Sequence, residues 1–249
     1  MVKIEQLIAG YTDVPILNGV SMEAHAGEIT TVIGCNGCGK STLLKALIGA
    51  LPAHSGKIQI DGCVSVGQKE LAKQIAYLPQ SKNVPDITAG RYVLHGRFPY
   101  LSYPRVYTKE DVRIAKEVME RLGISNLWDT LLAELSGGMR QKVYLAMALA
   151  KQAPVIIMDE PTTYLDIGQQ RLFAETVQAL AKAGKTVILV LHDILLALKI
   201  SDAICVMEDG RIKQTGAPAE ILSSGILEKL YGIEIAAIET AEGARYYYK

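Results

Sequence analysis

The chain has 249 residues, 49% of them hydrophobic and 21% charged, which is typical of a globular protein with a sizeable core. Its 26 basic and 26 acidic residues cancel. This balance argues against a general nucleic-acid binder, because such proteins usually carry a basic excess. No run approaches the roughly 18 apolar residues of a membrane span, and we expect no signal peptide. Any membrane role would therefore require a partner, and four cysteines without a secretory signal fit a reducing compartment.

The first eighty residues combine strand patterns with one helical pattern. Strands are predicted by short apolar runs between Gly and Asp turns, and they cover residues 3–11, 27–34, 56–62 and 74–80. A helix is predicted over residues 40–51, ended by Pro52.

The link between the second strand and this helix reads GCNGCGKS, a phosphate-binding loop. Gly34, Gly37 and Gly39 let the backbone turn tightly and bring its N–H groups close to an anion. Lys40 would reach the β- and γ-phosphates, and the Ser41 hydroxyl would coordinate Mg²⁺. Because a strand precedes the motif and a helix follows it, we predict nucleotide binding.

The same letters contain a C-x-x-C, formed by Cys35 and Cys38. In a phosphate loop the side chains at these positions mostly point away from the anion, so we interpret both cysteines as small packing residues. A zinc site would need about four ligands, and no second C-x-x-C exists. A redox role stays open, because a helix N-terminus lowers the pKa of a thiol.

The middle of the chain, residues 81–152, has a helical character. Helical spacing covers residues 86–98, 108–124 and 138–152, with an aromatic-rich link over 98–108. Ser136, Gly137 and Gly138 precede the last of these helices. They fit a simple N-cap or a second anion site. One nucleotide does not need two anion sites in one chain. A second anion site would be explained by two chains arranged head to tail, in which each phosphate loop faces the Ser-Gly-Gly segment of the other chain.

Strands and helices then alternate again. We predict strands over 153–160 and 185–192, a helix over 166–184, a hairpin over 202–216, and a strand or frayed tail over 236–249. Continuous apolar runs in both strands suit a parallel sheet buried on both faces. The sequence therefore predicts an α/β core interrupted by a helical segment.

Polar residues stand where these strands end. Asp159 would hold Mg²⁺ through its water shell, and Glu160 would polarise the attacking water as general base, although plain solvation is the alternative for an acid pair. His192 would bind the γ-phosphate and the attacking water, since α/β sheets bind ligands at the carboxyl ends of their strands; an ordinary hydrogen-bonded polar residue is the alternative. Gln80 is a candidate ligand of Mg²⁺ or water by the same logic.

The ordered set GCNGCGKST, YLPQ, LSGGMRQ, VIIMDEP, TTYLD and LHD resembles the ATPase subunit of ABC transporters over nearly the whole chain. The resemblance implies a P-loop NTPase core (1–80 and 153–249) with a mainly parallel sheet, an N-terminal antiparallel β subdomain and an inserted helical subdomain (81–152), all in a single ABC ATPase domain. It also implies a homodimer with two ATP molecules at its interface.

Within this family pattern, Tyr11 matches the aromatic residue that stacks on adenine, and Asp166 matches the acid that links the two sites, with a helix N-cap as its alternative. Met139 stands where the family usually has Gln. Glu160 and His192 are the implied catalytic residues, and Ser41, Gln80 and Asp159 the implied Mg²⁺ ligands. The implied ATP-binding residues are Tyr11, Gly34, Asn36, Gly37, Cys38, Gly39, Lys40, Ser41, Thr42, Gln80, Ser136, Gly137, Gly138, Met139 and Asp166.

The segment after Gln80, with its GRFPY piece, is similar to the ATPases of iron-siderophore, haem and vitamin B12 importers. This resemblance implies uptake of metal chelates through a separate integral-membrane permease, with Phe98, Tyr100 and Tyr103 as docking aromatics or as ordinary packing. It implies a peripheral location on the cytoplasmic face of the membrane, an indirect periplasmic or surface substrate-binding partner, and no nucleic acid. The alternatives are a subunit of a zinc or manganese importer and a soluble ABC ATPase that is not coupled to transport; a P-loop kinase would not explain LSGGM or His192.

Overall fold

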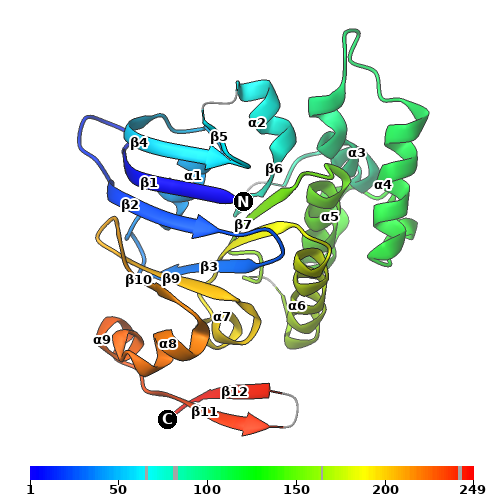
Figure 1. The fold of residues 1–249 in the computed structure, drawn as a ribbon. Helices are drawn as coiled ribbons and strands as arrows, with labels where there is room; N and C mark the ends of the chain where they lie inside the picture. Colours follow the sequence, from blue (N-terminus) through cyan, green and yellow to red (C-terminus); the bar gives the residue numbers. More distant parts are fainter. Residues whose placement is uncertain (65–66, 81–83, 164, 241–242) are drawn as a thin grey trace. The chain divides into compact units, whose positions relative to one another are not determined.

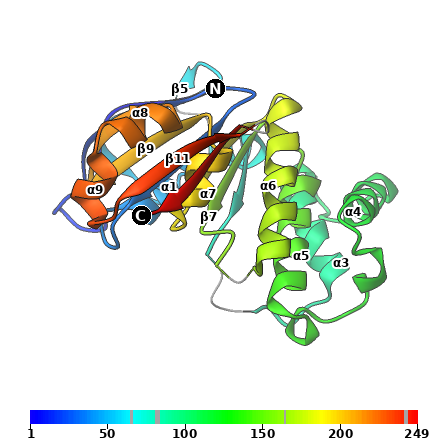
Figure 2. The ribbon, with the colours of Figure 1, turned by 90° about the horizontal axis from the view of Figure 1, so that it is seen from below.

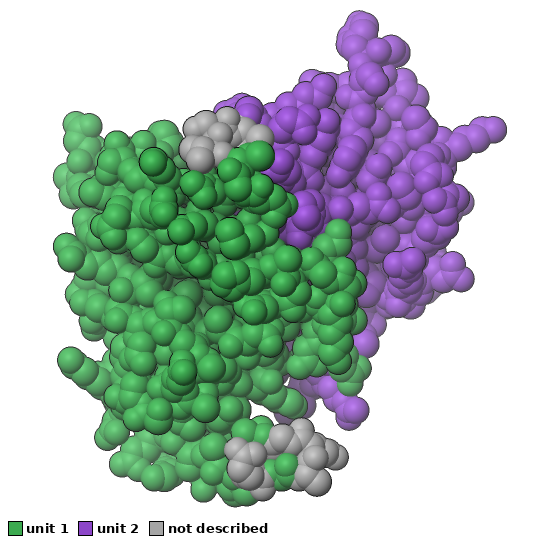
Figure 3. Space-filling view, viewed as in Figure 1, with its two compact units in different colours: residues 1–66, 174–249 green, residues 67–173 purple. Residues whose placement is uncertain are grey.

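The computed structural model describes residues 1–64, 67–80, 84–163, 165–240 and 243–249 (Figure 1, with a second view in Figure 2). Two compact units are present, unit 1 with residues 1–66 and 174–249 and unit 2 with residues 67–173 (Figure 3). Residues 81–83, Tyr164 of the TTYLD motif, and Ala241 and Glu242 of the predicted tail lie outside the described residues. Within the described ranges, no helix has the length and apolarity to cross a bilayer.

Unit 1 contains an antiparallel sheet near the N-terminus. Its strands are β1 (Val2–Ala9), β2 (Leu17–Ala24), β4 (Ala53–Ile60) and β5 (Cys63–Val64), in the order β2-β1-β4-β5. Val2 and Ile4 of β1 are buried, whereas Lys3 and Glu5 form an ion pair. This alternation is the period-two pattern of a strand with one face in the core.

Parallel strands form the rest of the unit 1 core. The strand β3 (Ile29–Gly34), buried at every position, pairs in parallel with β8 (Thr186–Val190) and with β9 (Ala203–Glu208). An antiparallel neighbour of β9, β10 (Arg211–Gly216), follows a turn whose residues Asp209 and Gly210 both have positive φ. The predicted hairpin over 202–216 is thus confirmed.

Helices and a second hairpin complete unit 1. They are α1 (Lys40–Leu47), α7 (Ile194–Ile200), α8 (Pro218–Ser223), α9 (Ile226–Tyr231), β11 (Ile235–Thr240) and β12 (Gly243–Tyr248). The strand β12 packs beside α7, and α8 contacts α9 (Figure 2). Residues 218–240 and 243–249 therefore form a C-terminal lobe on this unit.

Unit 2 combines helices with a parallel strand pair. Its elements are α2 (Gln68–Gln74), β6 (Ile75–Leu78), α3 (Ala89–Leu94), the 3₁₀ turns His95–Tyr100, Ser125–Leu127 and Leu132–Glu134, α4 (Lys109–Arg121), α5 (Gly137–Ala150), β7 (Val155–Asp159) and the start of α6 (Ile167–Lys182). The strands β6 and β7 are parallel, and α3, α4 and α5 pack on one another. The predicted α/β class, with a mainly parallel sheet, an antiparallel N-terminal sheet and a helical insertion, is confirmed.

Several local predictions are wrong in detail. The helix predicted over 40–51 ends at Leu47, because Gly49 adopts a left-handed φ of 72° and stops the helix before Pro52. The helix predicted over 86–98 is α3 followed by a 3₁₀ turn that contains Pro99. For the predicted tail, by contrast, the strand alternative is confirmed, because its described parts are strands that pair with each other.

A buried ion pair fixes the helical part of unit 2. Arg97 Nε donates to Asp111 Oδ1 at 3.0 Å, and Arg97 Nη1 donates to the Ala150 carbonyl at 3.1 Å. Burial raises the pKa of Asp111, but hydrogen bonds from the Thr108 amide and hydroxyl and from Arg97 outweigh it, so the pKa lies below its usual range. These bonds tie the start of α4 to the end of α5.

We predict that Asp111→Ala lowers the free energy of unfolding by about 3 kcal/mol, because it leaves the Arg97 charge buried and unpaired. Since the folded pKa is depressed, the contribution of Asp111 is complete above its ordinary pKa of about 3.9 and disappears as the pH falls through the folded value. Urea unfolding at several pH values measures both effects. The control is Glu110→Ala, which breaks the exposed pair with Arg113, and an equal loss in this variant would contradict the prediction.

Candidate active site

The phosphate loop of unit 1 connects β3 to α1. Gly37 and Gly39 have φ values of 80° and 105°, which non-glycine residues rarely adopt. A side chain on Gly34 would collide with the Met207 carbonyl and the Cys38 sulfur. The three glycines are therefore required by the backbone path of the loop.

The Lys40 ammonium lies inside this loop. Its Nζ donates to the carbonyls of Gly34 at 2.6 Å and Cys35 at 2.9 Å, and the residue is only 6% exposed. A buried ammonium is stable only with such partners. Asn36 and Ser41 are exposed beside it, whereas Thr42 is buried. The arrangement offers an anion one fixed positive charge together with the amides at the start of α1.

The two loop cysteines have different environments. Cys38 is buried and lies 3.9 Å from Lys40 Nζ; burial raises the pKa of its thiol, and the nearby Lys40 charge only partly offsets this. Cys35 is exposed, and its Sγ donates to the Leu230 carbonyl at 3.6 Å. The described part of the chain contains no group of three or more His, Cys, Asp or Glu side chains that could hold a metal ion. The burial of Cys38 fits the packing interpretation, whereas Cys35 is exposed and hydrogen-bonded, and a redox role of the pair stays a prediction.

Tyr11 stands beside α1. Its ring is 55% exposed, and its hydroxyl accepts a hydrogen bond from Lys45 Nζ at 3.0 Å. That bond is the main reason why the pKa of Tyr11 is lowered. The Lys45 ammonium also lies 5.1 Å from the ring centre. An exposed aromatic face held by a basic residue of α1 is suited to stacking on a flat base.

His192 lies at the same sheet edge as the phosphate loop. The strands β3 and β8 are parallel, with Val32 opposite Val190, so their carboxyl ends lead to Gly34 and to His192 respectively. His192 is exposed, and Asp193 after it caps α7 by accepting from the Leu196 amide at 2.9 Å. The structure thus places His192, the loop and Tyr11 in one unit.

Gln80 and Glu160 meet in unit 2. The parallel strands β6 and β7, with Leu78 opposite Met158, bring their carboxyl ends together. Gln80 Nε2 donates to Glu160 Oε2 there. Asp159 ends β7 and is buried, whereas Glu160 has a left-handed φ of 50°. This uncommon conformation for a non-glycine residue is often found at functional sites.

The serine-glycine cluster and Asp166 both cap helices. Ser136 Oγ accepts from the Met139 amide at 3.3 Å, and Asp166 Oδ1 accepts from the Gln169 amide at 2.8 Å. Ser136 and Gly137 are exposed. Gly138 is buried, and a side chain there would collide with Gln169. The N-cap interpretations are therefore confirmed, and each cap keeps an exposed polar edge.

Sequence reasoning missed two supports of the phosphate loop. The Gly210 amide donates to the Cys38 carbonyl at 3.0 Å, and the Leu230 carbonyl accepts from Cys35. Both residues are far from the loop along the chain, so no local pattern marks them. The residue pair Asp209–Gly210 predicts a hairpin turn, but it does not indicate that the turn contacts the phosphate loop.

The chain is similar to known ATP-binding proteins of transporters. Residues 17–163 match the family model described as ABC transporter. The chain is 36% identical to the ferric enterobactin transport ATP-binding protein FepC of Escherichia coli over 240 residues, 94% of this chain and 88% of that protein. It is 37% identical to the hemin import ATP-binding protein HmuV of Rhodococcus jostii over 229 residues, 90% of this chain and 77% of that one.

Solved structures share the fold. One is an inward-facing putative metal-chelate type ABC transporter, with a TM-score of 0.86 and 25% identity over 100% of this chain and 97% of that chain. Another is an ATP-binding subunit of an ABC transporter, with a TM-score of 0.81 and 26% identity over 93% of this chain and 98% of that chain.

Proposed function

The chain belongs to the ABC transporter family, and on that premise we propose that it is the ATP-hydrolysing subunit of an importer for iron-siderophore, haem or cobalamin-type chelates. The observation that carries the ATPase part is the phosphate loop closed around the buried Lys40 ammonium. The cargo class is supported by the names of relatives that transport ferric enterobactin and import hemin.

ATP would bind at the phosphate loop of unit 1. Lys40 and the loop amides from Asn36 to Thr42 would hold the phosphates, and Tyr11 would stack on adenine. Oxygen atoms of Ser41, Gln80 and Asp159 are a hydroxyl, an amide and a carboxylate, the donors that Mg²⁺ prefers. A bound Mg²⁺ would neutralise phosphate charge. Residues 81–152 would then be the helical subdomain of this enzyme.

Glu160 would act as the general base. The Gln80 amide donates to its carboxylate and fixes the direction of the side chain. Phosphoryl transfer depends mainly on positioning and charge stabilisation, and a held carboxylate supplies positioning for the attacking water. His192, at the edge of unit 1, would bind the γ-phosphate from its side.

A second copy of the chain would complete the site. Ser136 Oγ accepts from the Met139 amide, so its hydroxyl hydrogen is left to donate to a phosphate oxygen. This cap uses the backbone of Met139, so the departure from the usual Gln leaves it intact. Asp166, at the exposed start of α6, would link the two sites in the homodimer.

A membrane permease would receive the motion of the dimer. The link around the GRFPY piece exposes aromatic and apolar side chains, with Tyr103 97%, Val106 68%, Phe98 46% and Tyr100 38% exposed. Tyr100 already makes a contact within unit 2, since its hydroxyl donates to the Lys151 carbonyl at 2.8 Å. Aromatic residues are common in interface cores, so we place the permease here, at the cytoplasmic face of the membrane. A periplasmic or surface binding protein would deliver the cargo.

We expect Glu160→Gln to retain ATP binding while hydrolysis slows by about 100-fold or more, because the general base is lost. The variant should accumulate an ATP-bound dimer, which light scattering detects. The matched control is Glu120→Gln on the exposed face of α4. Near-normal turnover in Glu160→Gln would exclude Glu160 as the base.

The second-copy hypothesis predicts that Ser136→Arg binds ATP as a single chain but fails to form the ATP-dependent dimer, because the arginine fills the phosphate contact. Ser125→Arg, at another exposed serine of unit 2, is the control. Sedimentation with and without ATP distinguishes the two. A Ser136→Arg chain that dimerises with ATP like the unmodified protein would refute this site.

Transport assays test the cargo class. In vesicles that hold the ATPase with its permease and binding protein, we expect ATP-dependent uptake of a ferric siderophore, haem or cobalamin and none of free Zn²⁺ or Mn²⁺. Uptake of the free ions alone would assign the chain to a metal-ion importer. The Glu160→Gln assembly provides the background rate.

A further inference from the structure

The two cysteines of the phosphate loop stand at the ends of a tight turn. The Cys38 amide donates to the Cys35 carbonyl at 3.3 Å, and Gly37 between them has a φ of 80°. A hydrogen bond of this kind closes a four-residue β-turn, in which the first and last Cα atoms are less than about 7 Å apart. Disulfides usually join cysteines whose Cα atoms are about 4.4–6.8 Å apart. The backbone of the loop therefore already has the span that a Cys35–Cys38 disulfide needs.

The two thiols differ in access to solvent. Cys35 is exposed, whereas Cys38 is only 8% exposed. The Cys38 sulfur lies against the start of the loop, since a Cβ atom on Gly34 would be 2.7 Å from it, and it is 3.9 Å from Lys40 Nζ. Burial also raises the pKa of the Cys38 thiol. A dissolved oxidant therefore meets Cys35 first, and Cys38 follows Cys35 in the reaction.

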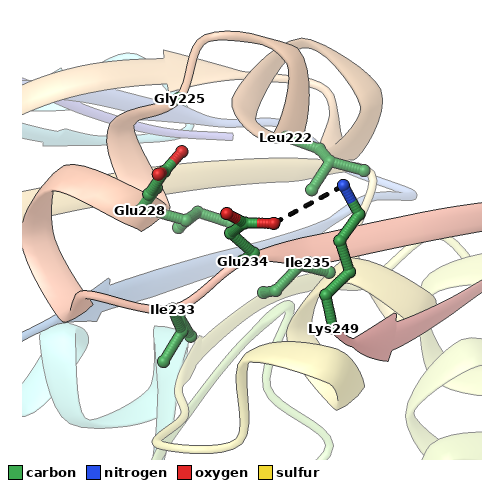
Figure 4. Close-up of a pocket in the computed structure, with 8 residues that line it drawn as sticks. Leu222, Gly225, Glu228, Ile233, Glu234, Ile235 and Lys249 are labelled. Atoms are coloured by element: carbon green, nitrogen blue, oxygen red, sulfur yellow. Dashed lines mark ion pairs between the residues drawn. The ribbon is translucent and has the colours of Figure 1, made fainter.

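The Cys35 thiol makes one weak bond in the reduced protein. Its Sγ donates to the Leu230 carbonyl of α9 at 3.6 Å, and a thiol is a poor hydrogen-bond donor. Leu230 belongs to the C-terminal lobe, in which Lys249 pairs with Glu234 at 3.6 Å across a pocket of about 280 Å³ between α8, α9 and the hairpin (Figure 4). Release of the Cys35 thiol from Leu230 thus breaks one weak bond and leaves this ion pair of the lobe intact.

We propose that Cys35 and Cys38 form a reversible disulfide within the phosphate loop, which lowers the affinity for ATP when a low-molecular-weight disulfide such as oxidised glutathione accumulates. The effect on ATP rests on the proposed function, since it needs the loop to be the ATP site. Formation of the disulfide itself depends only on the two cysteines.

The chemistry consists of two thiol–disulfide exchanges. The Cys35 thiolate attacks one sulfur of oxidised glutathione, the S–S bond of glutathione breaks, and one glutathione thiolate leaves and takes up the proton that Cys35 lost. The Cys38 thiolate then attacks the Cys35 sulfur and releases the second glutathione thiolate, which takes up the proton of Cys38. Two protein thiols are thereby oxidised to one disulfide, while one glutathione disulfide is reduced to two thiols.

The disulfide would disturb the atoms that hold Lys40. The Cys35 carbonyl accepts from Lys40 Nζ at 2.9 Å and from the Cys38 amide at 3.3 Å. Bond formation must draw the two sulfurs together, away from Leu230 and from the site beside Gly34, and it shifts the turn that carries this carbonyl. A lost hydrogen bond to a charged group corresponds to about tenfold in affinity. We therefore expect the oxidised loop to bind ATP at least about tenfold more weakly.

The test equilibrates the full-length chain in buffers of reduced and oxidised glutathione. Peptide mass spectrometry maps the disulfide, and a fluorescent ATP analogue reports the affinity. We expect a Cys35–Cys38 disulfide, an affinity lower by about tenfold or more, and recovery of the affinity after dithiothreitol. A mixed disulfide with glutathione as the sole product at Cys35, or a Cys35–Cys38 disulfide with unchanged affinity, would overturn the inference.

Reciprocal linkage gives a second readout. Whatever factor the disulfide removes from the affinity for ATP, saturating ATP must remove from the ratio of disulfide to dithiol at one fixed glutathione composition. The same mass spectrometry measures this ratio with and without ATP. A ratio that ATP leaves unchanged would contradict the coupling between oxidation and nucleotide binding.

Two serine variants serve as controls, each compared with its own reduced form. Cys63→Ser removes another exposed cysteine and should respond to oxidised glutathione like the unmodified protein. Cys35→Ser should show no loss of affinity that dithiothreitol reverses. Such a loss in Cys35→Ser would assign the effect to a different thiol and reject the proposed pair.

The reduced proteins separate the inference from the proposed function. Reduced unmodified protein that does not bind ATP, or reduced Lys40→Ala that binds it equally well, would reject the loop as the ATP site, whether or not the disulfide forms. Normal ATP binding by the reduced protein, lost in Lys40→Ala but equal in the oxidised and reduced unmodified protein, would reject the redox control alone.

Discussion

The contact between Lys40 Nζ and the carbonyls of Gly34 and Cys35 is the constraint on which the rest of unit 1 depends. A charged group can be buried only where polar atoms surround it, and backbone carbonyls can do this only if the chain wraps around the ammonium. That path requires positive φ at Gly37 and Gly39 and leaves no room for a side chain at Gly34. The buried strand β3 before the loop and the helix α1 after it hold the two ends of this turn.

In unit 2, the acidic side chain of Glu160 is also held in place by its surroundings. Glu160 is held outside the regular geometry of β7, with a φ of 50°, and receives the Gln80 amide from the end of β6. A parallel strand pair brings these two residues together although 80 positions separate them in the chain. Such an arrangement points the carboxylate of Glu160 in one direction, which is what general-base chemistry requires. The buried strand β7, which directly precedes Glu160, holds this uncommon backbone conformation in place.

Sequence reasoning predicted those parts of the structure that depend on residues close together in the chain. The phosphate loop, the helix caps at Ser136 and Asp166, and the buried strands follow from residue type and spacing, and the membership of the ABC transporter family follows from six ordered motifs. Local reasoning did not predict β2, whose sequence LNGVSMEA alternates weakly, or the early end of α1 at Gly49. It also could not find the contacts of Leu230 and Gly210 with the loop, because these depend on how distant segments pack.

Two residues of the candidate site, Ser136 and Cys35, also stabilise the local fold. Ser136 accepts from the Met139 amide, and a hydroxyl that accepts one bond still donates its hydrogen to another group. Removing that oxygen would therefore weaken the start of α5 together with any phosphate contact. Cys35 combines two roles in a similar way, since its carbonyl holds Lys40 while its thiol bonds Leu230. Because each such residue belongs to the fold and to the candidate site at once, small movements of the supporting elements would alter the geometry offered to ATP.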